Sequence, residues 1–325
     1  DSSDVMDTLI EHGFYFVVWL VLPVPALSVF AVRLFDQVSG MIGHSGFEYF
    51  AGPGSRKPSP FICTNFNDLH HSQIHNNFGN INLAISMQYF IDFLTIFIVI
   101  YLVTLAIYFS TGWLMMWVNK RYPQNRIQKK RDGMDRIKGE ILSSLKALAM
   151  SALLLSGGYF FQLQGWVLFE PVELSWWSFP LFFVIIFLLF DAWFYWGHRL
   201  LHLKPFYKWH KPHHLSIAPT AWSNDSSDVM DTLIEHGFYF VVWLVLPVPA
   251  LSVFAVRLFD QVSGMIGHSG FEYFAGPGSR KPSPFICTMF HDLHHSQFHY
   301  NFGNFLSVWD RWMGSVHPNY DAIVL

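Results

Sequence analysis

Charged residues are scarce in this chain. Only 13% of its 325 residues are Asp, Glu, Lys or Arg, and its mean hydropathy is +0.29. Soluble globular domains carry about 25% charged residues, so this scarcity argues against an ordinary soluble protein. Cysteine is nearly absent as well. Cys63 and Cys287 occupy the same position in two copies of one segment, so they indicate neither a disulfide framework nor a cysteine-based zinc site.

Long apolar segments take the place of the missing charges. Hydrophobic residues make up 52% of the chain and aromatic residues 18%. Three uninterrupted segments cover about 88–118, 143–169 and 176–197, and a fourth covers 232–266. Because about 20 consecutive apolar residues span the hydrocarbon core of a bilayer, we predict an all-α integral membrane protein built as a bundle of transmembrane helices.

The fourth segment is interrupted by Pro247 and Pro249. Proline cannot continue a helix without losing a hydrogen bond and clashing with the preceding turn. Two arms of about 15 residues each would reach only about 22 Å, less than the core thickness of about 30 Å. We therefore predict a proline-broken helical hairpin that enters the membrane and returns to the same side.

A basic loop separates the first two hydrophobic segments. Residues 119–139 contain eight Lys and Arg side chains, from Lys120 to Lys138. Positive loops lie in the cytoplasm by the positive-inside rule. Counting the segments from this loop places residues 198–222 and 268–325 on the cytoplasmic side too, where they would form a helical cap.

The chain contains a long internal repeat. Residues 1–64 and 225–288 are identical, and the similarity fades shortly afterwards, with Asn67 in the position of His291. A recent tandem duplication, a gene-model artefact and deliberate construction all remain open, and we favour an artefact or a fragmentary duplication. We predict that residues 1–86 are a truncated, non-catalytic duplicate of 225–305, that 87–325 is the catalytic domain, and that removing 1–86 preserves activity.

Histidines are concentrated in three clusters of the predicted cap. The sequences are HRLLH at 198–202, HKPHH at 210–214 and HDLHH at 291–295, and the isolated histidine His268 in the sequence GHS lies between the last two. Histidines four residues apart share one face of a helix, so each cluster can direct two or three imidazoles to one point. Together they predict a multi-histidine metal site. Imidazole binds iron, zinc, copper or nickel, so the residues alone do not identify the metal.

The three clusters, in this order around this membrane pattern, resemble the fatty acid hydroxylase/sterol desaturase superfamily. The flanking sequences DAWFYWGHR at 191–199, NFGN at 301–304 and WDRWMG at 309–314 strengthen the resemblance. It implies a di-iron site whose ligands are His198, His202, His210, His213, His214, His268, His291, His294 and His295. His299 and Glu272 remain open as additional ligands.

The resemblance also implies a function. It indicates an O₂-dependent oxidoreductase that hydroxylates or desaturates a sterol or fatty-acyl lipid, with two iron ions as cofactors and electrons from a cytochrome b5- or ferredoxin-type donor. Zinc could occupy the site in the purified protein. We expect the protein in a bacterial inner membrane or the endoplasmic reticulum, with its active site facing the cytoplasm and no nucleic-acid partner.

Two alternative functions and one tentative residue stay open. A zinc-dependent membrane hydrolase would use a histidine site, although Arg199 stands where HExxH enzymes have glutamate; a metal-binding or transport protein is the other alternative. Asp191 lies seven residues before His198 in an apolar segment. Because intramembrane carboxylates are costly and usually functional, we predict that Asp191 orients a ligand histidine.

Overall fold

The computed structural model describes residues 81–275 and 284–324. Residue contacts set Gln88–Leu325 apart as a compact unit, and the description below concerns that unit. The N-terminal copy of the repeat falls outside the described residues up to residue 80, so the prediction that it is non-catalytic remains a prediction.

The described part of the chain is helical and contains only two isolated β-bridges in addition to helices. Its long helices are α4 (Ile81–Arg121), α5 (Ile137–Gln164), α6 (Ser178–Leu201) and α10 (Ala250–Gly267). The short helices are α7 (Tyr207–His214), α8 (Val229–His236), α9 (Phe238–Val245), α11 (Thr288–Ser296), α12 (Val308–Met313) and α13 (Tyr320–Val324). The prediction of an all-α fold is confirmed.

Four of these helices are long and apolar enough to cross a membrane, judged by length and composition. The candidate spans are Met87–Arg121, Met134–Gln164, Ser178–Leu201 and Ala250–Gly267. The three uninterrupted segments of the sequence thus became α4, α5 and α6. Helix α5 ends earlier than predicted, because Gly165 adopts a left-handed conformation (φ 73°) that closes the helix.

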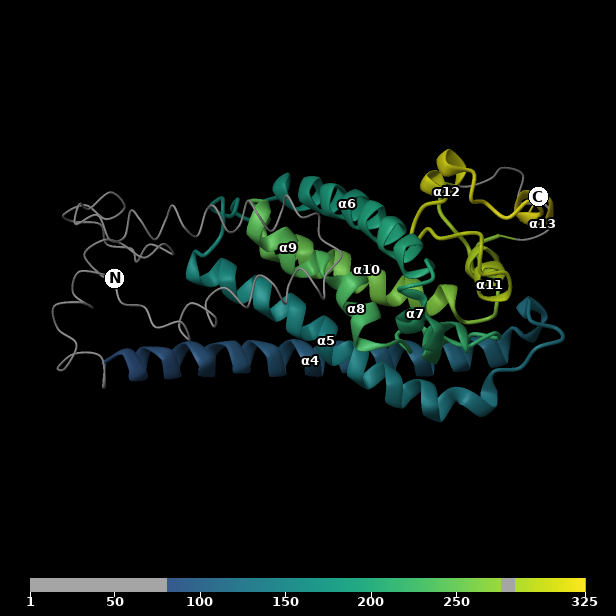
Figure 1. The fold of residues 1–325 in the computed structure, drawn as a ribbon, viewed down its shortest axis with the longest axis horizontal. Coiled ribbons are helices and arrows are strands. Elements are labelled where there is room, and N and C mark those ends of the chain that lie inside the picture. Colours follow the sequence, from purple (N-terminus) through teal and green to yellow (C-terminus); the bar gives the residue numbers. More distant parts are fainter. Residues whose placement is uncertain (1–80, 276–283, 325) are drawn as a thin grey trace. The chain divides into compact units, whose positions relative to one another are not determined.

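The fourth segment forms the predicted hairpin. Helix α9 ends at Val245, residues Leu246–Pro249 are extended or irregular, and α10 runs back (Figure 1). Both arms pack on the same core: Trp243 of α9 contacts Phe254 of α10 edge-on, with ring centroids 5.6 Å apart. The hairpin therefore starts and finishes at the end of the bundle where α7 and α11 lie.

The core of the unit is aromatic and aliphatic. One cluster joins α5, α6 and the hairpin and contains Ile186, Phe190, Tyr239, Trp243 and Val253, each almost fully buried. The outer surfaces are apolar as well: Leu102 on α4 is 58% exposed and Leu188 on α6 is 50% exposed. Apolar surface on this scale is costly in water, so this composition suits helices surrounded by lipid.

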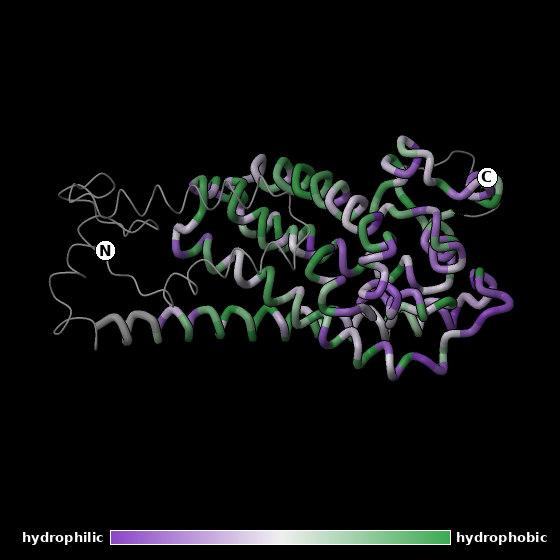
Figure 2. The backbone as a smooth tube through the Cα atoms, viewed as in Figure 1, coloured by the Kyte–Doolittle hydropathy of each residue, from purple (hydrophilic) through white to green (hydrophobic). Residues whose placement is uncertain are grey.

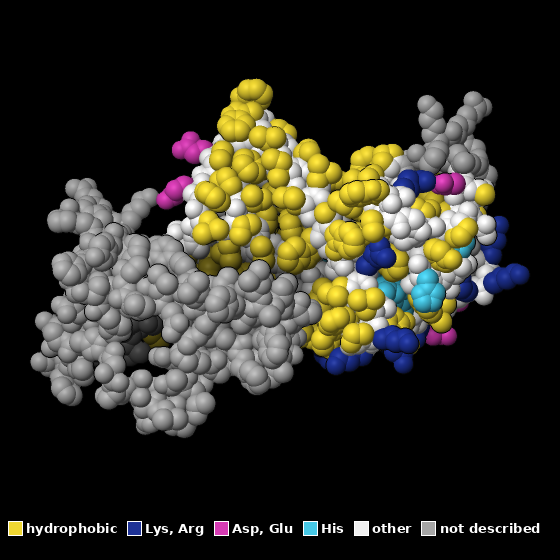
Figure 3. All heavy atoms as spheres, turned by 45° about the horizontal axis from the view of Figure 1, so that its top comes forward, with side chains coloured by type: hydrophobic (Ala, Val, Ile, Leu, Met, Phe, Trp, Pro, Cys, Tyr) yellow, Lys and Arg dark blue, Asp and Glu magenta, His cyan; other side chains and the backbone are white. Residues whose placement is uncertain are grey.

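Polar residues gather at one end of the helical bundle. Figure 2 shows hydrophobic residues along the long helices and hydrophilic residues around α7, α11 and the loop after α4, and Figure 3 shows the Lys and Arg side chains near the same end. The basic loop binds this end directly. The Ile127 amide donates to the Gly270 carbonyl at 3.0 Å, and Arg131 forms a salt bridge with Asp292 of α11. The loop and the histidine clusters therefore lie at one end, as predicted.

Exposed tryptophans occur at both ends of α6. Trp176 is 88% exposed and Trp177 48% exposed just before the helix begins, and Trp196 is 48% exposed near its other end. This separation matches the two levels at which an aromatic belt would meet the membrane surfaces.

Candidate metal centre

The nine predicted histidines come from four helices that end or begin at the polar end of the bundle. His198 lies in the last turn of α6 and His202 caps it, α7 carries His210, His213 and His214, His268 caps α10, and α11 carries His291, His294 and His295. Eight of the nine are buried, and His202 is partly exposed. The structure thus brings together every histidine that the resemblance implied.

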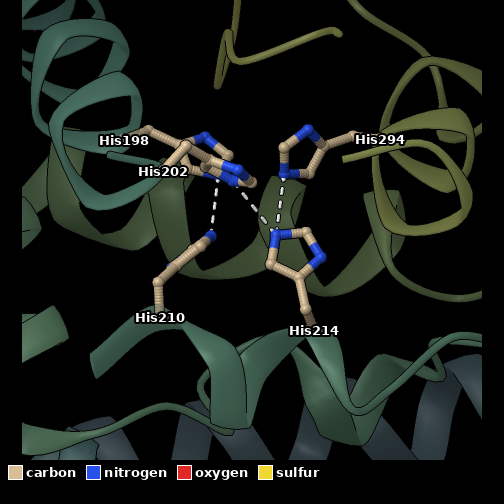
Figure 4. Close-up of side chains that lie close together, drawn as sticks. All are labelled: His198, His202, His210, His214 and His294. Atoms are coloured by element: carbon tan, nitrogen blue, oxygen red, sulfur yellow. Dashed lines mark hydrogen bonds between the residues drawn. The ribbon is translucent and has the colours of Figure 1, made fainter. Parts of the chain in front are cut away.

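Five of these side chains form the first histidine group: His198, His202, His210, His214 and His294 (Figure 4). Figure 4 shows the two imidazoles of α6 facing the two of α7, with His294 from α11 beside them. The Nε2 atoms of His198 and His210 are 3.0 Å apart, and His214 Nε2 lies 3.1 Å from the Nε2 atoms of both His202 and His294.

The other four form the second histidine group: His213, His268, His291 and His295. Its Nε2 atoms are equally close. His268 lies 2.8 Å from His291 and 3.3 Å from His213 and His295, and His291 lies 3.0 Å from His295. Histidines at spacing i and i+4 (His291 and His295) face one point because they occupy one helix face.

The two groups adjoin, since neighbouring residues divide between them. His213 and His214 are consecutive on α7 but belong to different groups, and so are His294 and His295 on α11. Across the boundary, the rings of His214 and His295 have centroids 5.0 Å apart. Two metal sites built on these groups would therefore be close neighbours.

The hydrogen bonds of the ring nitrogens show that these groups fit a cation. His198 Nδ1 donates to the Phe302 carbonyl at 2.9 Å, and His210 Nδ1 donates to Asp231 at 3.1 Å. Oxygen acceptors of this kind require the proton on Nδ1, so Nε2 of each neutral ring carries a lone pair. Two lone pairs 3.0 Å apart repel each other unless a positive ion lies between them.

The spacing of the nitrogens also suits coordination. Two nitrogens bound about 2.1 Å from one metal, with an angle of about 90–109° between them, are about 3.0–3.4 Å apart. The observed Nε2 separations of 2.8–3.3 Å lie close to this range. The donor set is compatible with metal binding, and nitrogen ligands accept iron, zinc and copper alike.

The environment keeps the imidazoles neutral. Burial first, and neighbouring imidazoles second, lower the pKa of His202 to about 2. Burial lowers the pKa of His213 to about 4 and that of His294 to about 3. The pKa values of His268, His291 and His295 also lie well below their usual value for the same reasons. A metal needs the unprotonated form of histidine, so the fold prepares these ligands.

A carboxylate that the sequence analysis missed orients one ligand. Asp231 of α8 is fully buried, and both its oxygens lie 3.1 Å from His210 Nδ1. Carboxylates in this position fix the orientation of a metal-binding histidine and raise its basicity. One signal was available: residues 225–236 carry four acidic side chains in a chain poor in charge, with Asp231 and Glu235 at helical spacing.

Asp191 does not have the predicted contact with His198. Its Oδ1 accepts hydrogen bonds from the amides of Phe305 and Leu306, at 2.8 and 3.1 Å. Seven residues correspond to about 10 Å along a helix, so Asp191 lies too far along α6 to reach the imidazole. It anchors instead the segment that follows Phe302, whose carbonyl binds His198.

The motifs around the last histidine cluster shape the same segment. Asp310 accepts hydrogen bonds from the amides of Phe302 and Gly303 and from the Ser315 hydroxyl. Asn301 has a left-handed backbone (φ 61°), which asparagine tolerates better than most residues, and its side chain binds the Phe290 carbonyl and the His317 amide. These contacts hold the Phe302 carbonyl in place against His198.

The two residues left open as additional ligands lie outside both groups. Glu272 accepts hydrogen bonds from the amides of Phe274, Ala275 and Met289, so both its oxygens are occupied by backbone. His299 is exposed and belongs to no ligand group found among the described residues.

Helix α7 has two different faces. His210, His213 and His214 are buried on the inner face, whereas Lys208 and Lys211 are exposed on the outer one. This single helix therefore separates the histidine groups from the surroundings on its side.

A cavity of about 450 Å³ adjoins both histidine groups. His198 and His210 of the first group and His213, His268 and His291 of the second line it. Much of the remaining wall is apolar, including Phe194, Phe259, Phe285, Phe305 and Ile266. The volume lies within the range of about 300–1,000 Å³ that is typical of small-molecule pockets, so an apolar ligand can reach the imidazoles.

Comparison with known proteins agrees with this arrangement. Residues 183–315 match the fatty acid hydroxylase family. A Δ7-sterol 5(6)-desaturase of Gibberella zeae is 26% identical over 232 residues, covering 68% of this chain and 62% of the relative. Methylsterol monooxygenase 1 of Gallus gallus is 31% identical over 126 residues, covering 38% of this chain and 42% of the relative.

The chain spans a little less than two thirds of the length of the desaturase from Gibberella zeae. Lathosterol oxidase of Rattus norvegicus is similar as well, at 29% identity over 192 residues, which cover 57% of this chain and 63% of the relative. No solved structure matches. The helical bundle, the histidine clusters and these relatives together support the assignment of residues 183–315 to the fatty acid hydroxylase/sterol desaturase superfamily.

Proposed function

We propose that this protein is a membrane-bound oxidoreductase that uses O₂ to hydroxylate or desaturate a lipid of sterol or fatty-acyl type. Electrons would come from an external cytochrome b5- or ferredoxin-type donor. The observation that supports this proposal best is the pair of adjoining, neutral histidine groups beside one largely apolar cavity. Relatives named as sterol desaturases and a methylsterol monooxygenase point to the same class of reaction.

Two iron ions are the proposed cofactors. The first histidine group would hold one and the second histidine group the other, because each gathers buried Nε2 atoms at separations suited to one ion. An iron pair supplies the activation of dioxygen that breaking an unactivated C–H bond requires, since no side chain is a strong enough oxidant.

The protein's own residues perform the remaining tasks. Asp231 and the Phe302 carbonyl hold His210 and His198 in fixed orientations with the proton on Nδ1. Phe194, Phe259 and Phe305 line the cavity with apolar surface, which admits a lipid and excludes water from the histidines. The outcome, hydroxylation or desaturation, depends on which hydrogens the cavity presents to the site.

The domain assignment and orientation belong to the same proposal. Residues 87–325 form the catalytic domain, and 1–86 contribute nothing to catalysis. The basic loop supports a cytoplasmic location of the histidine end, because the same loop that carries the positive charge contacts α11 through Arg131 and Asp292.

Metal analysis combined with oxygen uptake tests the proposal. The full chain would be purified in detergent, its iron and zinc content measured, and O₂ consumption followed with reductant, electron carrier and sterol or fatty-acyl lipid. We expect close to two irons per chain and lipid-dependent uptake. Stoichiometric zinc without uptake would instead support a zinc-dependent membrane hydrolase, and metal without either activity would support metal binding or transport.

A further inference from the structure

The cavity has a polar wall that the metal centre does not use. Beside the histidines it is lined by Asp225, Glu235, His236, Arg257, Asp260 and Asn304. These residues come from the segment before α8, from the end of α8, from α10 and from the segment after α11. A lipid that filled the cavity would therefore meet both the imidazoles and this polar wall.

Most groups of the polar wall already have partners. Arg257 donates to Ser151, Asp260 and Gln261, so each nitrogen of its guanidinium has a partner. Asp260 accepts from Tyr239 and Asn304 as well as from Arg257. Among the described lining residues Arg257 is the only Lys or Arg, and three carboxylates line the same cavity. The wall therefore offers no free cation to an anionic lipid.

Glu235 differs from its neighbours. Within the described part of the chain its carboxylate has no hydrogen-bond or salt-bridge partner, although the residue is largely shielded from solvent and lines the cavity. A buried carboxylate without a partner is costly. Glu235 thus presents an unsatisfied acceptor to whatever occupies the cavity.

The position of Glu235 relates this acceptor to the metal centre. Oxygens of Glu235 and Asp231 and a nitrogen of His210 lie within 4.8 Å of one another. His210 belongs to the first histidine group, where its Nε2 lies 3.0 Å from that of His198. A ligand group bound to Glu235 is therefore held beside the first histidine group.

We propose that Glu235 accepts a hydrogen bond from a hydroxyl group of the lipid substrate and that this subsite selects neutral, hydroxyl-bearing lipids over carboxylates, phosphates and sulfates. The proposal names the substrate class of the site described above and rests on the proposed function. It has a consequence for regiochemistry: because the hydroxyl binds next to His210, the C–H bonds within reach are those a few bonds from the hydroxyl carbon.

Equilibrium binding tests the subsite directly. The probes are a radiolabelled Δ7-sterol with a free hydroxyl, the same sterol with that hydroxyl methylated, and its sulfate ester. The full-length protein in detergent should bind the alcohol about ten- to a hundredfold more tightly than the ether, since the ether leaves a buried acceptor without a donor and that loss corresponds to a ratio of this size. It should bind the sulfate more weakly still.

Two variants assign the preference to Glu235. Glu235→Leu should lower the affinity for the alcohol to that for the ether without changing the latter. Glu235→Gln keeps an acceptor and adds a donor that the ether oxygen can accept, so it should bind the ether more tightly and reduce the ratio of alcohol affinity to ether affinity. This variant also provides a test if Glu235→Leu fails to fold. Glu173→Leu, at an exposed carboxylate in the α5–α6 connection, is the matched control and should leave all three affinities unchanged.

Turnover separates this inference from the proposed function. Equal affinity of the unmodified protein for alcohol and ether, or a preference that survives in Glu235→Leu, overturns the subsite. A preference that disappears in Glu235→Leu supports it, even if no lipid stimulates oxygen uptake, in which case only the proposed oxidation fails. With turnover, the site of oxidation in the product should lie near the hydroxyl, and a remote site contradicts the inference.

Discussion

Replacing Asp231 should weaken metal binding at the first histidine group. The Asp231 carboxylate receives the Nδ1 proton of His210 at 3.1 Å from both oxygens, and both residues are almost completely buried. Loss of such an orienting partner typically reduces metal affinity by about 10–100-fold, which corresponds to about 1.4–2.8 kcal/mol. Asp231→Asn keeps the shape of the side chain but loses its charge, so its loss of metal affinity should lie at the lower end of this range. The loss in Asp231→Ala should lie at the upper end.

A chelator competition measures this effect. The purified variants would be loaded with iron(II), titrated with a chelator of known affinity, and the metal retained per chain plotted against free chelator. We expect one of the two metals to leave at about 10–100-fold lower chelator concentration in the variants, while the second leaves as in the unmodified protein. Asp135→Asn, in the exposed basic loop, is the control. Identical titration curves for both Asp231 variants and the unmodified chain would refute the assigned role.

Three further changes follow from the structure. His291→Asn introduces the residue that the first copy carries at Asn67, and it should remove about one metal ion per chain. A chain that starts at residue 87 should keep both metal ions, and loss of metal from that truncated chain would contradict the domain assignment. Burial lowers the pKa of His213 to about 4 and that of His294 to about 3, so the unfolded chain takes up protons below pH ~6.5 before the folded chain does. The metal-free protein should therefore lose stability as the pH falls from ~6.5 to ~4, by up to about 1.4 kcal/mol per pH unit for each histidine. A melting temperature in detergent that stays constant over this pH range would count against neutral buried imidazoles. Asp310→Asn should lower the free energy of unfolding by about 1–3 kcal/mol, because the amides of Phe302 and Gly303 lose a charged acceptor. Denaturant titration would measure this loss, and an unchanged free energy of unfolding would show that other contacts hold the segment.

Much of this architecture could be predicted from sequence because it depends on local spacing. Runs of apolar residues gave α4, α5 and α6, and Pro247 and Pro249 gave the hairpin, since proline breaks a helix wherever it occurs in the interior. The i, i+4 spacing of His291 and His295 directs both imidazoles to one point by helix geometry alone.

Contacts between distant segments were less accessible. The assignment of His213 and His214 to different histidine groups depends on how α7 packs against α6 and α10, which spacing does not specify. The prediction for Asp191 considered only the angle around α6 and neglected the distance of about 10 Å along its axis. The roles of Asp231 and Glu235 become visible only once α8 lies beside α7, because His210, which both approach, is on another helix.

The two-faced helix α7 has a consequence for electron supply. With side chains, an α-helix is only about 10–12 Å across, and this one turns His210 and His214 inward while it presents Lys208 and Lys211 outward. A small acidic carrier docked on those lysines would stand one helix diameter from the imidazoles. Reducing equivalents from the proposed external donor would then have only this one helix to cross.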